Sequence, residues 1–161
     1  MLRRYLTLAD SIFSCRNGGR LVTVTVTNKV LVVEDDPDAR IFISNLLTSH
    51  GFDPILAETR TEGLRKAIDN NPALIIIDMM MIGEGGIQMY QDLKGDEKLC
   101  NVPVIMLATI DHKLFFKWHK IRKSNLNGLK PDIYLKKPIE AEELIRITNK
   151  LIRTEAAEPV I

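Results

Sequence analysis

Short apolar runs without in-out alternation recur along this chain, and they constrain its fold more than any other feature. Four clear runs occupy residues 30–33, 74–77, 104–107 and 133–135, and a weaker, partly polar run occupies 52–57. A strand that is apolar at every position is buried on both faces, as in a parallel sheet covered by helices. The runs therefore predict five strands of such a sheet.

Segments with helical spacing separate these runs. The first helix is predicted to begin with Asp36 as N-cap and Pro37 at its first position, and to stop before Gly51. Further helices are predicted over about 61–70, 87–94, 111–126 and 140–153. Residues predicted to face the core in the first two helices are Phe42, Ile43, Leu46, Leu47, Leu64, Ala67 and Ile68. Right-handed crossovers then favour a five-stranded, doubly wound α/β sheet with five helices.

Composition excludes several classes of protein. The 161 residues suit one domain with a real core, and the formal net charge of +1 provides no global attraction to nucleic acid or membrane. Cys15 and Cys100 are far apart and form no metal-binding motif, which favours a reducing cytoplasm. No apolar run approaches the length of a membrane span. Asp10 interrupts the signal-like start, which argues against export.

Charged or hydroxyl-bearing residues follow four of the apolar runs. They are Glu34, Asp35 and Asp36 after the first run, Asp78 after the second, Thr109 beyond Ala108 after the third, and Lys136 and Lys137 after the last. In a parallel sheet these strand ends share one rim, where clustered carboxylates repel unless a cation lies among them. Mg²⁺ prefers such oxygen ligands. With a lysine nearby, the set predicts a phosphoryl-transfer site in which Asp78 is the nucleophile.

Each part of this set also has a structural interpretation. The acidic run at 34–36 suits a helix start, Asp78 alone could be a loop residue, and Lys137 could be a surface lysine before Pro138. Their conjunction at one rim favours the phosphoryl-transfer site.

The same residues resemble the response regulator receiver family. Residues 29–40, 74–86, 102–107 and 134–138 are similar, in the correct order, to the family's acidic turn, phosphoacceptor strand, fourth strand and fifth strand. The resemblance covers 29–153 and implies a flavodoxin-like fold with strand order 2-1-3-4-5. Residues 1–28 lie outside it, and 154–161 are predicted to be a short tail.

The resemblance also implies roles for individual residues. Asp78 matches the aspartate that a histidine kinase or phosphotransfer protein phosphorylates. Glu34 and Asp35 match the Mg²⁺-binding acidic pair, with Asp35 favoured as the direct ligand, and Met80 matches the position whose carbonyl completes the metal site. Lys137 matches the lysine that pairs with the phosphoryl group, followed by a cis bond to Pro138. Tyr134 matches the aromatic residue that responds to a hydroxyl at the end of the fourth strand.

This chain departs from the family pattern near that hydroxyl. Ala108 stands where the family has a hydroxyl, and Thr109 comes one residue later, facing away unless a bulge turns it back. The Thr109–Tyr134 switch is therefore in question, whereas the phosphoacceptor chemistry is not. Ile82 and Gly85 replace the usual Pro and Asp, which predicts a more mobile loop beside Asp78.

The segment between the fourth and fifth strands is longer than usual, basic and aromatic. Its residues include Lys117, Trp118, Lys120 and Lys123. We expect the 111–153 face to dock an acidic protein partner, with nucleic acid disfavoured and homodimerisation left open. An amphipathic helix whose lysines are merely solvated explains the pattern equally well.

Residues 1–28 have three interpretations: a disordered tail, an extra edge strand over 21–27, or a start codon assigned too early. The predicted function is that of a stand-alone phosphoacceptor rather than an enzyme, with signalling through protein contacts. The alternative is a receiver-like interaction module that works without phosphorylation. A phosphohydrolase is disfavoured, because Met80 occupies the position where such enzymes place an acid/base Asp.

Overall fold

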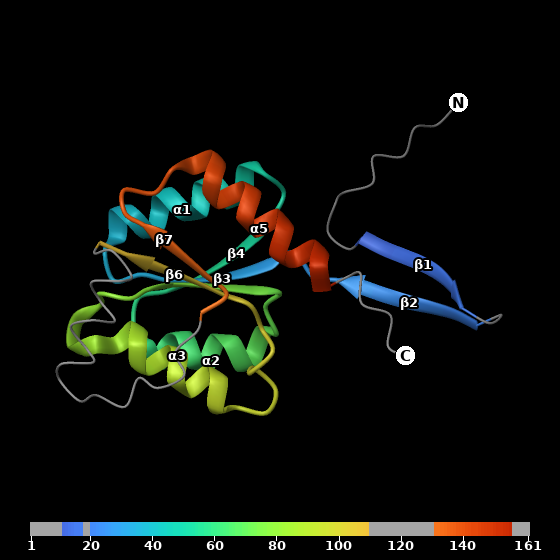
Figure 1. Ribbon diagram of the computed structural model, residues 1–161, viewed down its shortest axis with the longest axis horizontal. Coiled ribbons are helices and arrows are strands. Elements are labelled where there is room, and N and C mark those ends of the chain that lie inside the picture. The colour runs from blue at the N-terminus through green and yellow to red at the C-terminus, as the bar shows by residue number, and fades with distance from the viewer. Residues whose placement is uncertain (1–10, 18–19, 110–130, 156–161) are drawn as a thin grey trace.

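The computed structural model describes residues 11–17, 20–109 and 131–155. Its main element is a five-stranded sheet in the order β4-β3-β5-β6-β7, in which every neighbouring pair is parallel (Figure 1). The strands are β3 (Lys29–Val33), β4 (Asp53–Ala57), β5 (Leu74–Asp78), β6 (Val104–Ala108) and β7 (Ile133–Lys136). This order corresponds to 2-1-3-4-5, so the predicted flavodoxin-like sheet is confirmed.

Helices cover both faces of the sheet. They are α1 (Pro37–Ser49), α2 (Arg60–Asn70), α3 (Gly85–Gly95) and α5 (Ala141–Glu155), with a short 3-10 turn η1 (Ile82–Glu84) ahead of α3. Figure 1 shows α1 and α5 on one face and α2 and α3 on the other, and each pair buries its own apolar cluster against the sheet. The helix predicted over 111–126 lies outside the described residues.

Local capping explains where the first two helices begin. The side chain of Asp36 accepts a hydrogen bond from Ala39 N at 2.7 Å, and that of Thr59 accepts one from Glu62 N at 3.3 Å. Each cap satisfies an amide that the first helical turn leaves unpaired. The cap predicted at Asp36 is thereby confirmed.

Two residues predicted to face the core do not. Phe42 is 48% exposed and Ile68 is 55% exposed. The second helix, α2, instead approaches α3 closely at Gly63. A Cβ at this position would lie only 2.8 Å from Met89 Cε of α3. An apolar pattern does not reveal this close approach of α2 and α3, because glycine adds nothing to the pattern.

The N-terminal residues form a separate two-stranded antiparallel sheet. Strands β1 (Ser11–Asn17) and β2 (Arg20–Val26) pair along their whole length. The extra edge strand, which was one of the three interpretations of residues 1–28, corresponds to β2. This strand pairs with β1, while β4 and β7 remain the outer strands of the main sheet. None of the helices within the described ranges is long and apolar enough to cross a membrane.

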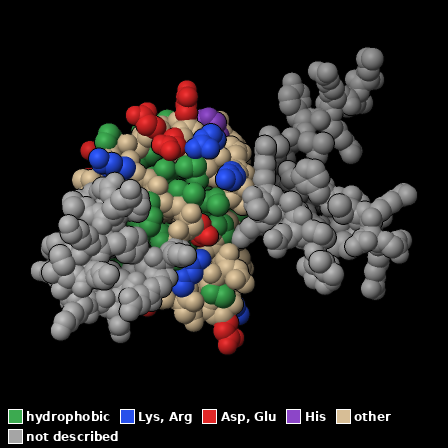
Figure 2. Space-filling view, viewed as in Figure 1, with side chains coloured by type: hydrophobic (Ala, Val, Ile, Leu, Met, Phe, Trp, Pro, Cys, Tyr) green, Lys and Arg blue, Asp and Glu red, His purple; other side chains and the backbone are tan. Residues whose placement is uncertain are grey.

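The described residues on the face of the molecule in Figure 2 carry side chains of both charge signs. Acidic, basic and hydrophobic side chains are interspersed over the described residues on that face.

Candidate functional site

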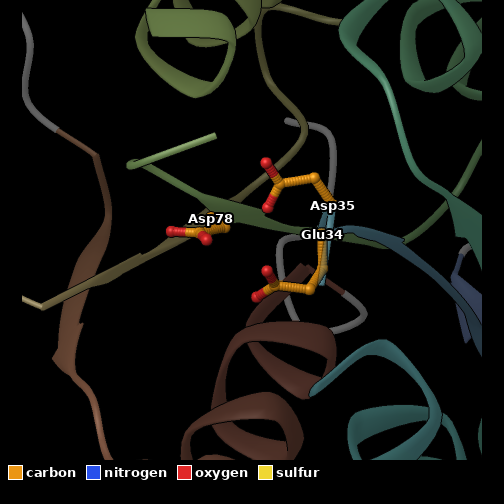
Figure 3. Close-up of side chains that lie close together, drawn as sticks. All are labelled: Glu34, Asp35 and Asp78. Atoms are coloured by element: carbon orange, nitrogen blue, oxygen red, sulfur yellow. The ribbon is translucent and has the colours of Figure 1, made fainter. Parts of the chain in front are cut away.

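The carboxyl ends of β3 and β5 bring three carboxylates to one rim of the sheet. Glu34 and Asp35 directly follow β3, and Asp78 is the last residue of β5. The strands are paired in register up to Val33 and Ile77, so the residues after them emerge side by side. Figure 3 shows the three side chains turned toward a common space. Within the described residues, one oxygen from each carboxylate lies within 4.8 Å of the others.

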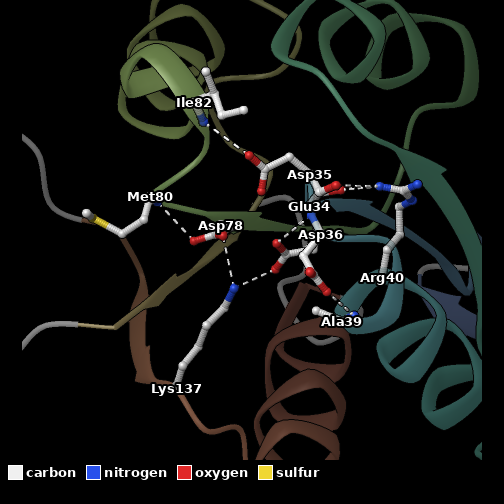
Figure 4. A network of polar contacts seen from close by, with 9 residues as sticks. All are labelled: Glu34, Asp35, Asp36, Ala39, Arg40, Asp78, Met80, Ile82 and Lys137. Carbon is white, nitrogen blue, oxygen red and sulfur yellow. Dashed lines mark hydrogen bonds and ion pairs between the residues drawn. The ribbon is translucent and has the colours of Figure 1, made fainter.

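Lys137 supplies an ammonium group to this cluster. It follows β7, and its Nζ lies 2.7 Å from Glu34 Oε2 and 2.9 Å from Asp78 Oδ2 (Figure 4). Glu34 is fully buried, and only 5% of Asp78 is exposed. Charges this far from water interact more strongly than charges on an open surface.

One ammonium does not balance these acids. Burial, opposed by Lys137 and reinforced by the nearby Asp78, raises the pKa of Glu34 to about 7. Burial alone would lower the pKa of Lys137, but its bonds to Glu34 and Asp78 outweigh burial and raise it. Among the described residues, the acids of this cluster therefore carry more negative charge at neutral pH than Lys137 offsets.

The donor atoms fit a hard divalent cation. Glu34, Asp35 and Asp78 offer only oxygen, which Mg²⁺ prefers, and this cluster contains no His or Cys that would favour a softer metal. Backbone amides orient two of the acids, since Met80 N donates to Asp78 Oδ1 at 2.9 Å and Ile82 N donates to Asp35 Oδ2 at 3.1 Å. A carboxylate oxygen can accept more than one bond, so these contacts leave room for a metal.

The other predicted site residues lie around this cluster. The side chain of Met80 points outward and is half exposed, which leaves its carbonyl role a prediction. Ala108 is buried at the end of β6, with its carbonyl accepting a bond from Lys137 N at 2.8 Å. Thr109 lies beyond the strand end and is exposed. The peptide bond from Lys137 to Pro138 is cis, as the resemblance implied.

Tyr134 lies on β7, partly buried against the cluster of side chains beneath α2 and α3. Burial first, and the nearby Tyr90 second, raise the pKa of Tyr134 to about 12. The ring therefore stays neutral across the physiological range. Its predicted switching role stays a prediction.

Sequence reasoning missed Arg40. Its Nη1 donates to the carbonyl of Glu34 at 2.6 Å and to that of Asp35 at 3.4 Å (Figure 4). The position of Arg40 near the start of α1 could have indicated such contacts. The helix dipole disfavours a basic residue there unless the residue has a specific acceptor.

Gly86, in the first turn of α3, lies directly against the backbone of Asp78. A Cβ at this position would lie 2.0 Å from the carbonyl oxygen of Asp78 and 2.8 Å from Met79 Cα. Only a glycine permits this approach.

Comparisons with known proteins agree with this geometry. The family model described as the response regulator receiver domain matches residues 30–149. Hybrid signal transduction histidine kinase D of Dictyostelium discoideum is 34% identical over 131 residues, 80% of this chain and 8% of that protein. Protein PilH of Pseudomonas aeruginosa is 27% identical over 124 residues, which cover 77% of this chain and 97% of PilH.

A solved structure shares the fold. The receiver domain of a sensor histidine kinase from Pseudomonas aeruginosa, which has a magnesium ion coordinated in its active-site cleft, superimposes with a TM-score of 0.66. Its sequence is 24% identical, and the match covers 79% of this chain and 98% of that one.

Proposed function

Because this chain belongs to the response regulator receiver domain family, we propose that it accepts a phosphoryl group on Asp78 in a Mg²⁺-dependent reaction. One observation carries the proposal: a nearly buried aspartate lies within 2.9 Å of an ammonium group and shares a cluster of oxygen ligands with two further acids. This combination suits charge balance in phosphoryl transfer.

The residues of the site have distinct tasks in this reaction. An oxygen of Asp78 attacks phosphorus, and the bond from phosphorus to the donor's leaving group breaks with its electron pair going to that group. The amide of Met80, bonded to Asp78 Oδ1, helps to fix the carboxylate. Lys137 Nζ donates to a phosphoryl oxygen once that oxygen arrives beside Asp78 Oδ2.

Glu34, Asp35 and Asp78 would hold the metal, with the carbonyl of Met80 as a further ligand. Mg²⁺ would neutralise charge on the transferring phosphoryl group. The magnesium ion in the cleft of the Pseudomonas receiver domain supports this assignment, because that domain has the same fold.

A histidine kinase or a phosphotransfer protein would be the phosphoryl donor, and both reactants would be cytoplasmic. The kinase from Dictyostelium supports a signalling context, although this chain spans only 8% of its length. The signal would leave by contact with another protein. Of the predicted 111–153 docking face, β7 and α5 are described, and the basic residues Lys117, Lys120 and Lys123 lie outside the described part.

The test is phosphorylation with acetyl phosphate and Mg²⁺, followed by intact mass spectrometry. We expect a mass gain of one phosphoryl group that falls to background in Asp78→Asn and after removal of Mg²⁺ by a chelator. Asp53→Asn is the matched control, since Asp53 is exposed at the opposite end of a strand. Equal labelling of Asp78→Asn and the wild type would rule out the proposed acceptor.

A buried methyl group at Ala108 and an exposed Thr109 favour a second candidate function, an interaction module that does not respond to phosphate. Hydrogen exchange of β7 and α5 separates the two. A change in protection after phosphorylation supports a phosphate-driven signal. An unchanged pattern in a chain that is shown by mass to be phosphorylated supports the phosphate-independent module.

A further inference from the structure

We infer that Arg40 is a positioning residue that sets the Mg²⁺ affinity of the site by fixing the backbone of the acidic turn. The inference rests on the proposed Mg²⁺ site, and it concerns a side chain that donates no bond to a carboxylate of the cluster. Arg40 acts through the two residues whose carbonyls it binds, Glu34 and Asp35.

Arg40 lies in α1, and its guanidinium group contacts the acidic turn formed by Glu34 and Asp35. Its side chain is only 17% exposed, and Nη1 reaches both carbonyls, at 2.6 Å for Glu34 and 3.4 Å for Asp35. A guanidinium group is planar and cannot lose its charge, so it can hold two neighbouring acceptors in a fixed relation. The peptide group between Glu34 and Asp35 is therefore held by Arg40, through the carbonyl oxygen of Glu34.

The orientation of Arg40 separates it from Lys137. Figure 4 shows the two cations on opposite sides of the acidic turn, with the carboxylates of Glu34 and Asp78 toward Lys137. Arg40 Nη2 also lies 3.4 Å from Glu58 Oε2, in the loop after β4. Because Glu58 is exposed, this ion pair adds little stability, but it offsets the positive charge of Arg40.

Two other hydrogen bonds also hold the acidic turn, and they would remain if Arg40 were replaced. Glu34 N donates to Ala57 O at 3.1 Å, and Asp36 N donates to Glu34 Oε1 at 3.3 Å. The first bond holds the backbone of Glu34 and the second orients its side chain, but neither of them involves the carbonyls that Arg40 holds. Groups that orient metal ligands typically change metal affinity by about 10- to 100-fold when they are removed.

The experiment compares Mg²⁺ binding, measured by titration calorimetry, in the full chain and three variants. Arg40→Gln should weaken binding roughly tenfold. Glu58→Gln, which leaves the carbonyl contacts intact, should stay within about twofold of the wild type. The double variant Arg40→Gln with Glu58→Gln keeps the net charge of the wild type, and it should be as weak as Arg40→Gln alone.

A second readout needs no metal. In the metal-free protein, Arg40→Gln should speed hydrogen exchange at the Asp36 amide, while Glu58→Gln should leave it unchanged. A purely structural role would instead lower the melting temperature without moving the affinity of the folded protein. If Arg40→Gln does not fold, Arg40→Lys, which keeps the charge but loses the planar fork, is judged by the same affinity and exchange criteria.

The outcomes separate this inference from the proposed function. A wild-type chain that binds no Mg²⁺ overturns both. A wild-type chain that binds Mg²⁺, together with an Arg40→Gln variant within about twofold of it, overturns the role of Arg40 alone. Recovery of wild-type affinity in the double variant also overturns it, because the effect would then come from charge rather than from position.

Discussion

A lysine lies at each rim of the sheet, Lys137 where the strands end and Lys94 where β6 begins, and the two have different partners. At the carboxyl rim, Lys137 faces two buried acids, Glu34 and Asp78, which it does not neutralise completely. At the amino rim, Lys94 donates to the carbonyls of Cys100 at 2.9 Å and Val102 at 3.0 Å. The same ammonium lies 3.9 Å from Asp132 and 5.7 Å from the ring centroid of Tyr90.

The two lysines differ in the groups that surround them. At the amino rim, Asp132 also accepts a bond from Val104 N at 2.8 Å and so ties the starts of β6 and β7 together. At the carboxyl rim, within the part of the chain that the structure describes, the carboxylates of Glu34, Asp35 and Asp78 outnumber the one ammonium group that contacts them, that of Lys137. Such strain costs stability, and it persists where function requires it.

The largest expected effect comes from removing the cation of the carboxyl rim. Lys137→Met should lower the free energy of unfolding of the metal-free protein by roughly 3–5 kcal/mol, because it leaves two buried carboxylates without a cation. Urea unfolding measures this change, and Lys136→Met, at an exposed neighbour, is the control. Mg²⁺ should restore part of the loss. Equal stability of the two variants would remove the contrast between the rims.

A smaller effect should appear as pH dependence. The folded pKa of Glu34, about 7, exceeds its ordinary value of 4.5, so the folded chain binds this proton more tightly than the unfolded chain. The associated stabilisation is complete below about pH 4.5 and is lost as the pH rises through 7, and it amounts to roughly 3 kcal/mol at most.

The difference between wild type and Glu34→Gln isolates this contribution, because glutamine does not titrate. Without metal, the stability of the wild type relative to the variant should fall between pH 5 and pH 8. A relative stability that stays level over this interval would contradict the strained state of the carboxyl rim.

The smallest effect is expected at the amino rim. Lys94→Met should cost about 1–2 kcal/mol of unfolding free energy, because it removes charge-assisted bonds to two carbonyls. Its Mg²⁺ affinity should remain that of the wild type. Lys98→Met, at an exposed position in the same connection, serves as the reference. A loss of Mg²⁺ affinity in Lys94→Met would show that the two rims are coupled.

Much of the fold could be predicted because it depends on local patterns. The apolar runs located the strands, and Asp36 and Pro37 located the start of α1. Which side of each helix faces the sheet was harder to predict. Phe42 and Ile68 are exposed, because the apolar pattern does not show which of the apolar residues of a helix the sheet covers. A strand over 21–27 was one of three interpretations of the first 28 residues, and its pairing with β1 was not predicted.

The site divides in the same way. The positions of Glu34, Asp35, Asp78 and Lys137 follow from parallel topology, since each ends or follows a strand at one rim. Arg40 could not be placed by that reasoning, because its acceptors are backbone carbonyls that have no residue type to recognise. Arg60 of α2 and Asp92 of α3 form an ion pair, with 2.6 Å between Nη2 and Oδ2. No local sequence pattern indicates that these two residues pair.

The glycine at position 86 has a mechanical consequence. With no side chain between them, the first turn of α3 and the peptide of Asp78 touch without any compressible layer. The methyl group of an alanine at this position would have to force the strand end and the helix apart. Any movement of the Asp78 backbone toward α3 would therefore press directly on the first turn of that helix.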